Sequence, residues 1–160
     1  MKFSPLSPLT FRRVCAKYST GVAIASVTGA GGVPLGLTIN SFTSVSLTPP
    51  LVLICIDLSS TAIRHFRYAK SFVINVLAEN QQALSVRFAR KGHHELSGIE
   101  CSPGTTGAPI LAEALAVLDC RLTRRLTVGD HVVLIGEVVA ASRRKGRPLI
   151  FFESSYHALR

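Results

Sequence analysis

Residues 36–50, GLTINSFTSVSLTPP, alternate between apolar and small polar side chains with the period of a β-strand. Successive side chains of a strand point to opposite faces, so one set can face a core while the other lines a surface. The set at odd positions suits a core: Leu37, Ile39, Thr43, Val45 and Leu47. The set at even positions offers hydroxyls, one amide and one aromatic ring but no charge: Thr38, Asn40, Phe42, Ser44 and Ser46. This uncharged polar face raises the question of what it binds.

Further elements are predicted on both sides of this stretch. A helix begins at Ser7 and Pro8, a hydroxyl cap followed by proline, and stops by Gly21. Strands are predicted over 22–27, 34–39, 51–56, 71–78, 115–123, 131–142 and 148–153, and short helices over 59–70 and 80–90. Residues 91–110 form the longest irregular segment, which we expect to be mobile or to cover a site. Because no crossover helix separates the last strands, the order favours an antiparallel β-barrel with peripheral helices.

Length and composition indicate one domain over residues 1–160 with more apolar surface than a monomer needs. The hydrophobic fraction is 48% and the mean hydropathy is +0.36, yet no apolar run is long enough to span a bilayer. The first residues carry prolines and arginines where a signal peptide has its apolar block. We therefore expect a cytoplasmic protein, with no membrane partner, that buries its excess apolar surface in a homodimer.

The net charge of +9 favours anionic partners, and it is unevenly distributed. Four cations cluster in one predicted turn: Arg143, Arg144, Lys145 and Arg147. This turn could recognise the 2′-phosphate of a nucleotide, or it could simply be a solvated loop. Nucleic acid is the least favoured partner, because the chain has no Trp and only three Tyr to stack on bases.

Several kinds of site are excluded by their missing motifs. The four cysteines form no CxxC pair, which argues against a metal site. A GxGxxG loop fails because its third glycine would fall at Pro34, and the chain has no GxSxG, P-loop or HExxH motif. An enzyme of this composition would leave the difficult chemistry to a bound cofactor.

The uncharged face at 36–50 suits a flat, neutral heteroaromatic ring such as an isoalloxazine, whose edge carries both donors and acceptors. The next hydroxyl-rich turn, at Ser59, Ser60 and Thr61, opens a predicted helix. The free amides of a helix start can bind phosphate, although a serine there can equally be an ordinary cap. The two features together indicate a phosphorylated flavin.

The chain resembles the short flavin reductases that supply reduced flavin to two-component monooxygenases. The resemblance rests on five blocks in order: STGVAIAS; GLTINSFTSVSLTPPLVLICI; SSTAIRHFRYAKSFVINVLAENQQALSVRFA; GAPILAEALAVLDCRL; and GDHVVLIGEVV with PLIFFESSYHAL. It implies a mainly β fold, a six-stranded antiparallel Greek-key split β-barrel with a few short peripheral helices. It also implies a homodimer with flavin near the subunit interface.

The same resemblance assigns the site residues by position. Those expected to line the isoalloxazine and ribityl chain are Thr38, Asn40, Ser41, Ser44, Val45 and Ser46. Ser60 and Thr61 are expected to meet the phosphate. Those expected to flank the phosphate or, for FAD, the adenosine are Phe88, Ala89 and Arg90. His131 and Tyr156 would lie where the nicotinamide stacks on the flavin, although His131 could be structural and Tyr156 a core aromatic. One departure is Ser155, where the family usually has a glycine before the final tyrosine.

These features predict an NAD(P)H:flavin oxidoreductase that reduces FMN or FAD by hydride transfer and supplies free reduced flavin to a partner monooxygenase. The alternative is a split-barrel flavoprotein that retains FMN as an electron carrier. A basic barrel that binds nucleic acid is a distant third. The sequence leaves open FMN against FAD, and NADH against NADPH.

Overall fold

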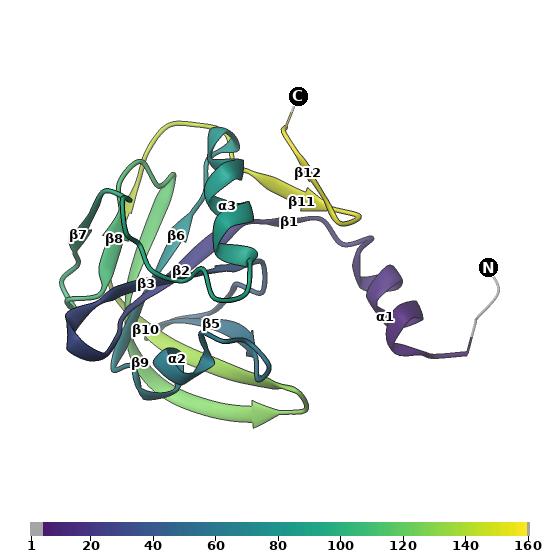
Figure 1. Cartoon of the computed structure of the whole chain (residues 1–160), viewed down its shortest axis with the longest axis horizontal. Coiled ribbons are helices and arrows are strands. Elements are labelled where there is room, and N and C mark those ends of the chain that lie inside the picture. The colour runs from purple at the N-terminus through teal and green to yellow at the C-terminus, as the bar shows by residue number, and fades with distance from the viewer. Residues whose placement is uncertain (1–4, 160) are drawn as a thin grey trace.

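The computed structural model describes residues 5–159 and is built mainly of β-strands (Figure 1). The helices are α1 Pro8–Cys15, α2 Ile63–Tyr68 and α3 Gln82–Ala89, with 3-10 turns η1 Ala30–Gly32 and η2 Glu79–Gln81. The first strands are β1 Thr20–Gly21, β2 Ala23–Thr28, β3 Pro34–Ile39, β4 Thr43–Leu47, β5 Pro50–Asp57 and β6 Ser71–Val76. The later strands are β7 Cys101–Pro103, β8 Pro109–Leu111, β9 Ala116–Val128, β10 His131–Arg143, β11 Ile150–Phe152 and β12 Ser155–His157.

Seven strands form one antiparallel sheet in the order β3-β2-β6-β9-β10-β5-β4. Two small sheets, β1-β11-β12 and β7-β8, lie beside it. The mainly β prediction is therefore confirmed, and so is the antiparallel order of the late strands. The predicted six-stranded Greek-key split barrel is not confirmed in detail, because the sheet has seven strands and its two edge strands do not pair with each other.

The stretch 36–50 is not the single strand that its alternation predicts. It is divided between β3, at one edge of the seven-stranded sheet, and β4, at the other edge. The break between the two strands falls at residues 40–42. The Ser41 hydroxyl accepts the N–H of Cys55 at 3.0 Å and donates to its carbonyl at 2.9 Å. The chain leaves the β3 ladder here because Ser41 bonds to β5 instead.

Local signals located the helices but overestimated their lengths. Ser7 caps α1 as predicted, accepting the N–H of Thr10 at 3.1 Å, but the helix ends at Cys15 because Thr20 and Gly21 pair with β11. The helix predicted over 59–70 covers only Ile63–Tyr68. The segment 91–110, predicted to be irregular, contains the short strand β7 and the start of β8.

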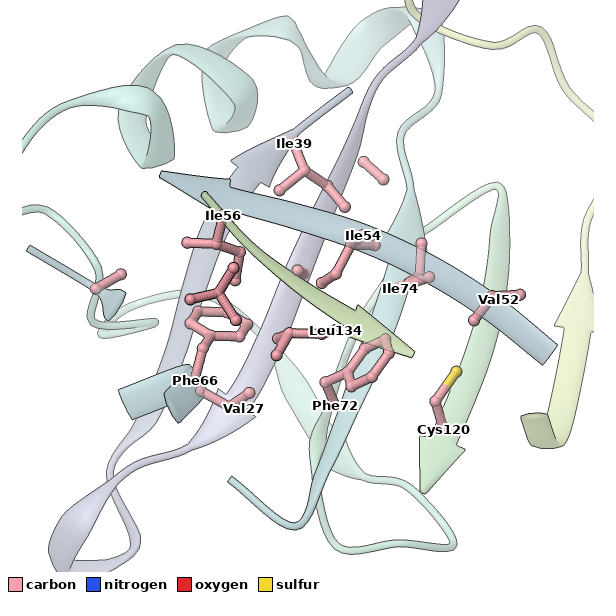
Figure 2. Close-up of a cluster of buried hydrophobic side chains, with 14 of the residues drawn as sticks. Val27, Ile39, Val52, Ile54, Ile56, Phe66, Phe72, Ile74, Cys120 and Leu134 are labelled. Atoms are coloured by element: carbon pink, nitrogen blue, oxygen red, sulfur yellow. The ribbon is translucent and has the colours of Figure 1, made fainter. Parts of the chain in front are cut away.

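The core lies inside the curved sheet and beneath its helices. Its main cluster gathers side chains from β2, β5, β6, β10 and α2, among them Ile54, Phe66, Phe72 and Leu134 (Figure 2). A second cluster packs under α3 around Phe88 and Leu96. By contrast, α1 buries no residue and lies apart from the sheet (Figure 1). Among residues 5–159, no helix has the length and hydrophobicity needed to cross a membrane.

We expect Gly136→Ala to lower the free energy of unfolding by about 1–3 kcal/mol, the usual cost of overpacking a core. A Cβ atom at Gly136 would lie 2.7 Å from the Phe72 ring and 2.9 Å from the Cys120 Cβ. Gly21→Ala is the matched control, because a Cβ there meets nothing within 4 Å. Urea denaturation of both variants checks this; equal effects of the two substitutions would contradict it.

Candidate functional site

A cavity of about 310 Å³ opens where β3 and β5 meet the segment that follows α3. This volume is typical of small-molecule sites, at the lower end of their range. Six residues that the sequence predicted for the site line it: Thr38, Asn40, Ser41, Ser60, Ala89 and His131. The other walls come from Leu37, Ile39, Cys55, Ile56, Asp57, Ser59 and Lys91. The cavity therefore collects residues from segments that are far apart in the sequence.

A second cavity of about 170 Å³ adjoins the first, since both are lined by Thr38, Ile39, Asn40 and Ala89. Its remaining walls are Val22, Ser85, Phe151 and Tyr156. The end of β3 thus forms a wall that the two cavities share, with His131 lining one and Tyr156 lining the other. This arrangement offers room for two ligands, or two parts of one ligand, side by side.

Hydroxyls of the shared wall also hold the fold together. Thr38 donates its hydroxyl hydrogen to the carbonyl of Ser85 at 2.7 Å, which ties β3 to α3. Ser41 donates to Cys55 across the break between β3 and β4. A hydroxyl that donates one hydrogen keeps lone pairs free to accept. Toward a ligand, Thr38 therefore acts as an acceptor, while Asn40 is exposed and can both donate and accept.

Tyr156 is held in place by a residue of α3. Its hydroxyl and the Ser85 hydroxyl form a hydrogen bond of 2.8 Å, and its ring meets Phe151 edge-on with 5.3 Å between centroids. Ser85 itself is fully buried. The same residue therefore accepts from Thr38 with its backbone and bonds Tyr156 with its side chain, which links the two walls of the smaller cavity.

The larger cavity contains three ionisable side chains at one end. The N–H of Ser59 donates to Asp57 at 2.6 Å and lowers the pKa of this carboxyl most, and the nearby His131 and Lys91 lower it further. Asp57 and His131 are register partners on β5 and β10, and His131 Nδ1 lies 2.6 Å from Asp130. Gly129 and Asp130 form the turn between β9 and β10.

The turn at 59–61 presents fewer free helix amides than the sequence suggested. The N–H groups of Ser60 and Ile63 donate to the carbonyls of Asp57 and Ser60, and Ala62 donates to the Ser60 hydroxyl at 3.3 Å. The Thr61 hydroxyl bonds to His94 at 2.7 Å and accepts the N–H of Gly92 at 3.0 Å. Because most of these groups are used within the fold, side chains become the more important candidates for binding a phosphate.

Some predicted site residues are not brought to the two cavities. Ser44, Val45 and Ser46 lie on β4, beyond the break at 40–42, and do not line either cavity. Phe88 is fully buried in the core under α3, so its side chain cannot reach a ligand. Arg90 caps α3 and is exposed beside the lining residues Ala89 and Lys91.

A family model described as a flavin reductase like domain matches residues 15–160. The chain belongs to this family. The FMN reductase (NADH) SmoA of Agrobacterium fabrum is 39% identical over 142 residues, which are 89% of this chain and 80% of SmoA. HsaB of Rhodococcus jostii, the reductase subunit of a flavin-dependent monooxygenase, is 38% identical over 152 residues, 94% of this chain and 77% of HsaB. The solved structure of the NADH:FAD oxidoreductase SgcE6 from Streptomyces globisporus has a TM-score of 0.91 and 32% identity, and the match covers 100% of this chain and 97% of SgcE6.

The site of this flavin reductase-like domain fits a flavin. The shared wall of Thr38, Ile39 and Asn40 is uncharged, as the polar edge of an isoalloxazine requires. Ala89 leaves space against this wall, and Lys91 supplies a cation at the end where Ser59 and Ser60 lie. Neutral hydrogen-bonding groups for the ring and a cation for a phosphate are therefore present in one cavity.

Four residues of the candidate site with polar or ionisable side chains were not predicted from the sequence. Cys55, Asp57 and Lys91 line the larger cavity, and Ser85 lines the smaller one. Ser85 had a detectable signal, because it lies four positions before Ala89 and so shares a helix face with it. Cys55 gave no signal of its own, since it reads as one more small residue in an apolar strand.

The departure at Ser155 places no strain on the site. Ser155 lies in the extended strand β12, whereas the left-handed backbone of this hairpin falls at Glu153, with φ 47°, and Ser154, with φ 63°. A glycine is favoured at those turn positions and not at 155. Ser155 is therefore compatible with the position that Tyr156 takes beside Ser85.

Acidification is expected to destabilise the domain through His94, because burial lowers the pKa of this imidazole below its ordinary 6.5. In the unfolded chain His94 takes up a proton near pH 6.5, whereas in the folded chain it does so only at lower pH. The contribution of neutral His94 to the free energy of unfolding is therefore complete above pH 6.5 and is lost as the pH falls below it. His65 shifts in the same direction, and the lowered pKa of Asp57 matters only below its ordinary 3.8.

The melting temperature, followed by circular dichroism, should therefore fall between about pH 7.5 and about pH 5.5. His94→Asn should reduce this fall, because its side chain does not titrate. His93→Asn, at the exposed neighbouring position, should keep the wild-type fall. An unchanged fall in His94→Asn would show that the pKa of His94 does not control stability in this range.

Proposed function

We propose that this domain is an NAD(P)H:flavin oxidoreductase that reduces FMN or FAD by hydride transfer and releases the reduced flavin to a separate monooxygenase. The observation that carries the proposal is the pair of adjoining cavities with a common uncharged wall at the end of β3. One cavity suits a flavin ring, and the other suits the nicotinamide beside it. The activities that name SmoA and SgcE6 support this assignment, and the name of HsaB supports a monooxygenase partner.

Side chains of the chain bind and orient the two ligands. Thr38 and Asn40 offer an acceptor and an amide to the edge of the ring, and Lys91 offers its ammonium group to a phosphate. A bound flavin accepts at N5 the hydride that the nicotinamide C4 gives up. Tyr156, fixed by Ser85, bounds the side from which the nucleotide approaches, and His131 lines the opposite end. Their contribution is proximity and exclusion of water, so no side-chain nucleophile is required.

The second candidate is a flavoprotein that retains FMN as an electron carrier. The same cavities would serve it, and the two functions differ in how firmly the flavin is held. Lys91 and Asn40 are both exposed. Contacts at exposed positions exchange with water at little cost, which favours a flavin that leaves over one that stays.

Oxidation of each nucleotide against each flavin tests the proposed activity. NADH or NADPH should be oxidised only when FMN, FAD or riboflavin is added. The rate should depend on the concentration of added flavin and not on the amount of flavin that is bound to the purified protein. The control is the spectrum of the purified protein before any addition. Absence of flavin-dependent oxidation with every pair would contradict the proposal, and a stoichiometric yellow protein that turns over added flavin poorly would establish the carrier.

We further propose that the curved seven-stranded sheet has the topology of a Greek-key split barrel. Only residues 40–42 separate β3 from β4, although these strands lie at opposite edges of the seven-stranded ladder. The Ser41–Cys55 bonds bring the two edges together without a continuous ladder. A cytoplasmic location also stays a prediction.

A homodimer is proposed on the apolar surface that surrounds β4. Among the described residues this edge strand pairs only with β5, and Leu47 on it is 92% exposed. The helix α1 exposes Phe11 and Val14. A few residues later in the sequence, Tyr18 lines a cavity of about 380 Å³ together with Phe42. That cavity shares Ile39, Asn40 and Ser41 with the proposed flavin site. A second copy bound here would lie next to the flavin.

Leu47→Glu is expected to convert a dimer into a monomer, because it places a charge in the centre of this apolar surface. The folded monomer should tolerate the substitution, since Leu47 is almost fully exposed. Val33→Glu, at another exposed apolar position, in the turn before β3, is the control and should leave the dimer intact. Size-exclusion chromatography with light scattering measures the mass; a dimeric Leu47→Glu variant would contradict this interface.

A further inference from the structure

Residues 91–96, which follow α3, are hydrogen-bonded to the free edge of β3. Gly36 donates its N–H to the carbonyl of His94 at 2.7 Å, and Leu96 donates to the carbonyl of Pro34 at 3.0 Å. The Leu96 side chain is 2% exposed and packs in the cluster under α3. The second half of the segment is therefore fixed by backbone bonds and by burial.

One hydroxyl makes the side-chain hydrogen bonds that hold the first half of the segment. Thr61, just before α2, accepts the N–H of Gly92 at 3.0 Å and bonds to His94 Nε2 at 2.7 Å. His94 is 7% exposed, so its ring is largely shielded from water, while Thr61 on the other side of the bond is exposed. A hydroxyl has one hydrogen and two lone pairs, and these two bonds use most of its capacity. Thr61 is thus committed to the segment 91–96.

Lys91 is the residue directly before the bonded Gly92, and it lines the larger cavity. Its charge is close enough to Asp57 to help lower the pKa of that carboxyl. A lysine ammonium sits on a long flexible stem, so its position depends on where the backbone holds the stem. The bond from Gly92 to Thr61 fixes that backbone at the edge of the cavity.

We propose that Thr61 and His94 form a clamp that positions Lys91 for the phosphate of a flavin nucleotide. In this arrangement Lys91 contacts the ligand, while Thr61 and His94 are positioning residues that act through Gly92. The expectation that Thr61 itself meets the phosphate is replaced by an indirect role. The inference rests on the proposed function, since it takes the ligand to be a flavin.

Affinity for FMN and for riboflavin, which lacks the phosphate, separates the indirect role from direct contact. The four proteins compared are wild type, Thr61→Val, Lys91→Met and the double variant. Each single substitution should raise the Kd of FMN about twofold to fivefold, the range expected for an exposed charged contact, and leave the Kd of riboflavin nearly unchanged. The double variant should bind FMN no more weakly than Lys91→Met alone, because Thr61 acts through Lys91.

Three further variants control for the chemistry of the clamp. Thr61→Ser keeps the hydroxyl and should bind FMN like wild type. His94→Leu removes the partner of Thr61 and should reproduce the loss seen in Thr61→Val. His93→Leu changes the adjacent exposed histidine and should have no effect.

Hydrogen exchange measures the clamp without any ligand. Backbone amides of residues 91–96 should exchange faster in Thr61→Val and His94→Leu than in wild type, while β6 should be unchanged. Unchanged exchange in residues 91–96 would overturn the proposal. So would additive losses of FMN affinity in the double variant, which would show that Thr61 contacts the phosphate directly, or equal losses for FMN and riboflavin. If wild type bound neither flavin, the proposed function itself would fail, and the exchange data would still decide whether the clamp exists.

Discussion

The chain passes from one edge of the seven-stranded sheet to the other in only three residues, 40–42. The four Cα steps from Ile39 to Thr43 span at most about 14 Å, so the sheet must curl until its edges nearly meet. At the join, the Ser41 hydroxyl bonds to both backbone groups of Cys55, in register with the Thr43–Leu53 pair of the next strand. The larger cavity opens at this join, which explains why both β3 and β5 line it.

Groups that form the site are also groups that hold the fold. Thr38 donates to the backbone of Ser85, and Ser85 bonds Tyr156, so β3, α3 and the last hairpin are connected through two hydrogen bonds between neutral groups. Because its hydrogen is committed, Thr38 meets a ligand as an acceptor, whereas Asn40 can both donate and accept. The wall is polar but uncharged because neutral hydrogen bonds connect β3, α3 and the last hairpin.

Local chemistry made part of this structure predictable. The Ser7 cap and the strand over 51–56 follow from neighbouring residues alone, and both are found, although β5 alternates between buried and partly exposed residues instead of being buried throughout. The division of 36–50 between opposite edges depends on Cys55, which no local pattern connects with Ser41. For the same reason alternation placed Ser44 and Ser46 on one face with Thr38, and position in a motif could not reveal that Phe88 points into the core. Long-range pairing decides these positions.

The distribution of charge bears on how tightly a flavin is held. The basic turn faces a separate cavity, where Arg144 bonds Glu113 at 2.7 Å and Arg147 donates to the carbonyl of Leu159 at 3.4 Å. The larger cavity of the site has one lysine, Lys91, and its positive charge also acts on the Asp57 carboxylate, whose pKa it helps to lower. One exposed ion pair stabilises a complex by about 1 kcal/mol or less. A phosphate therefore adds little to the affinity of the ring, and a flavin held mainly by neutral contacts can leave once it has been reduced.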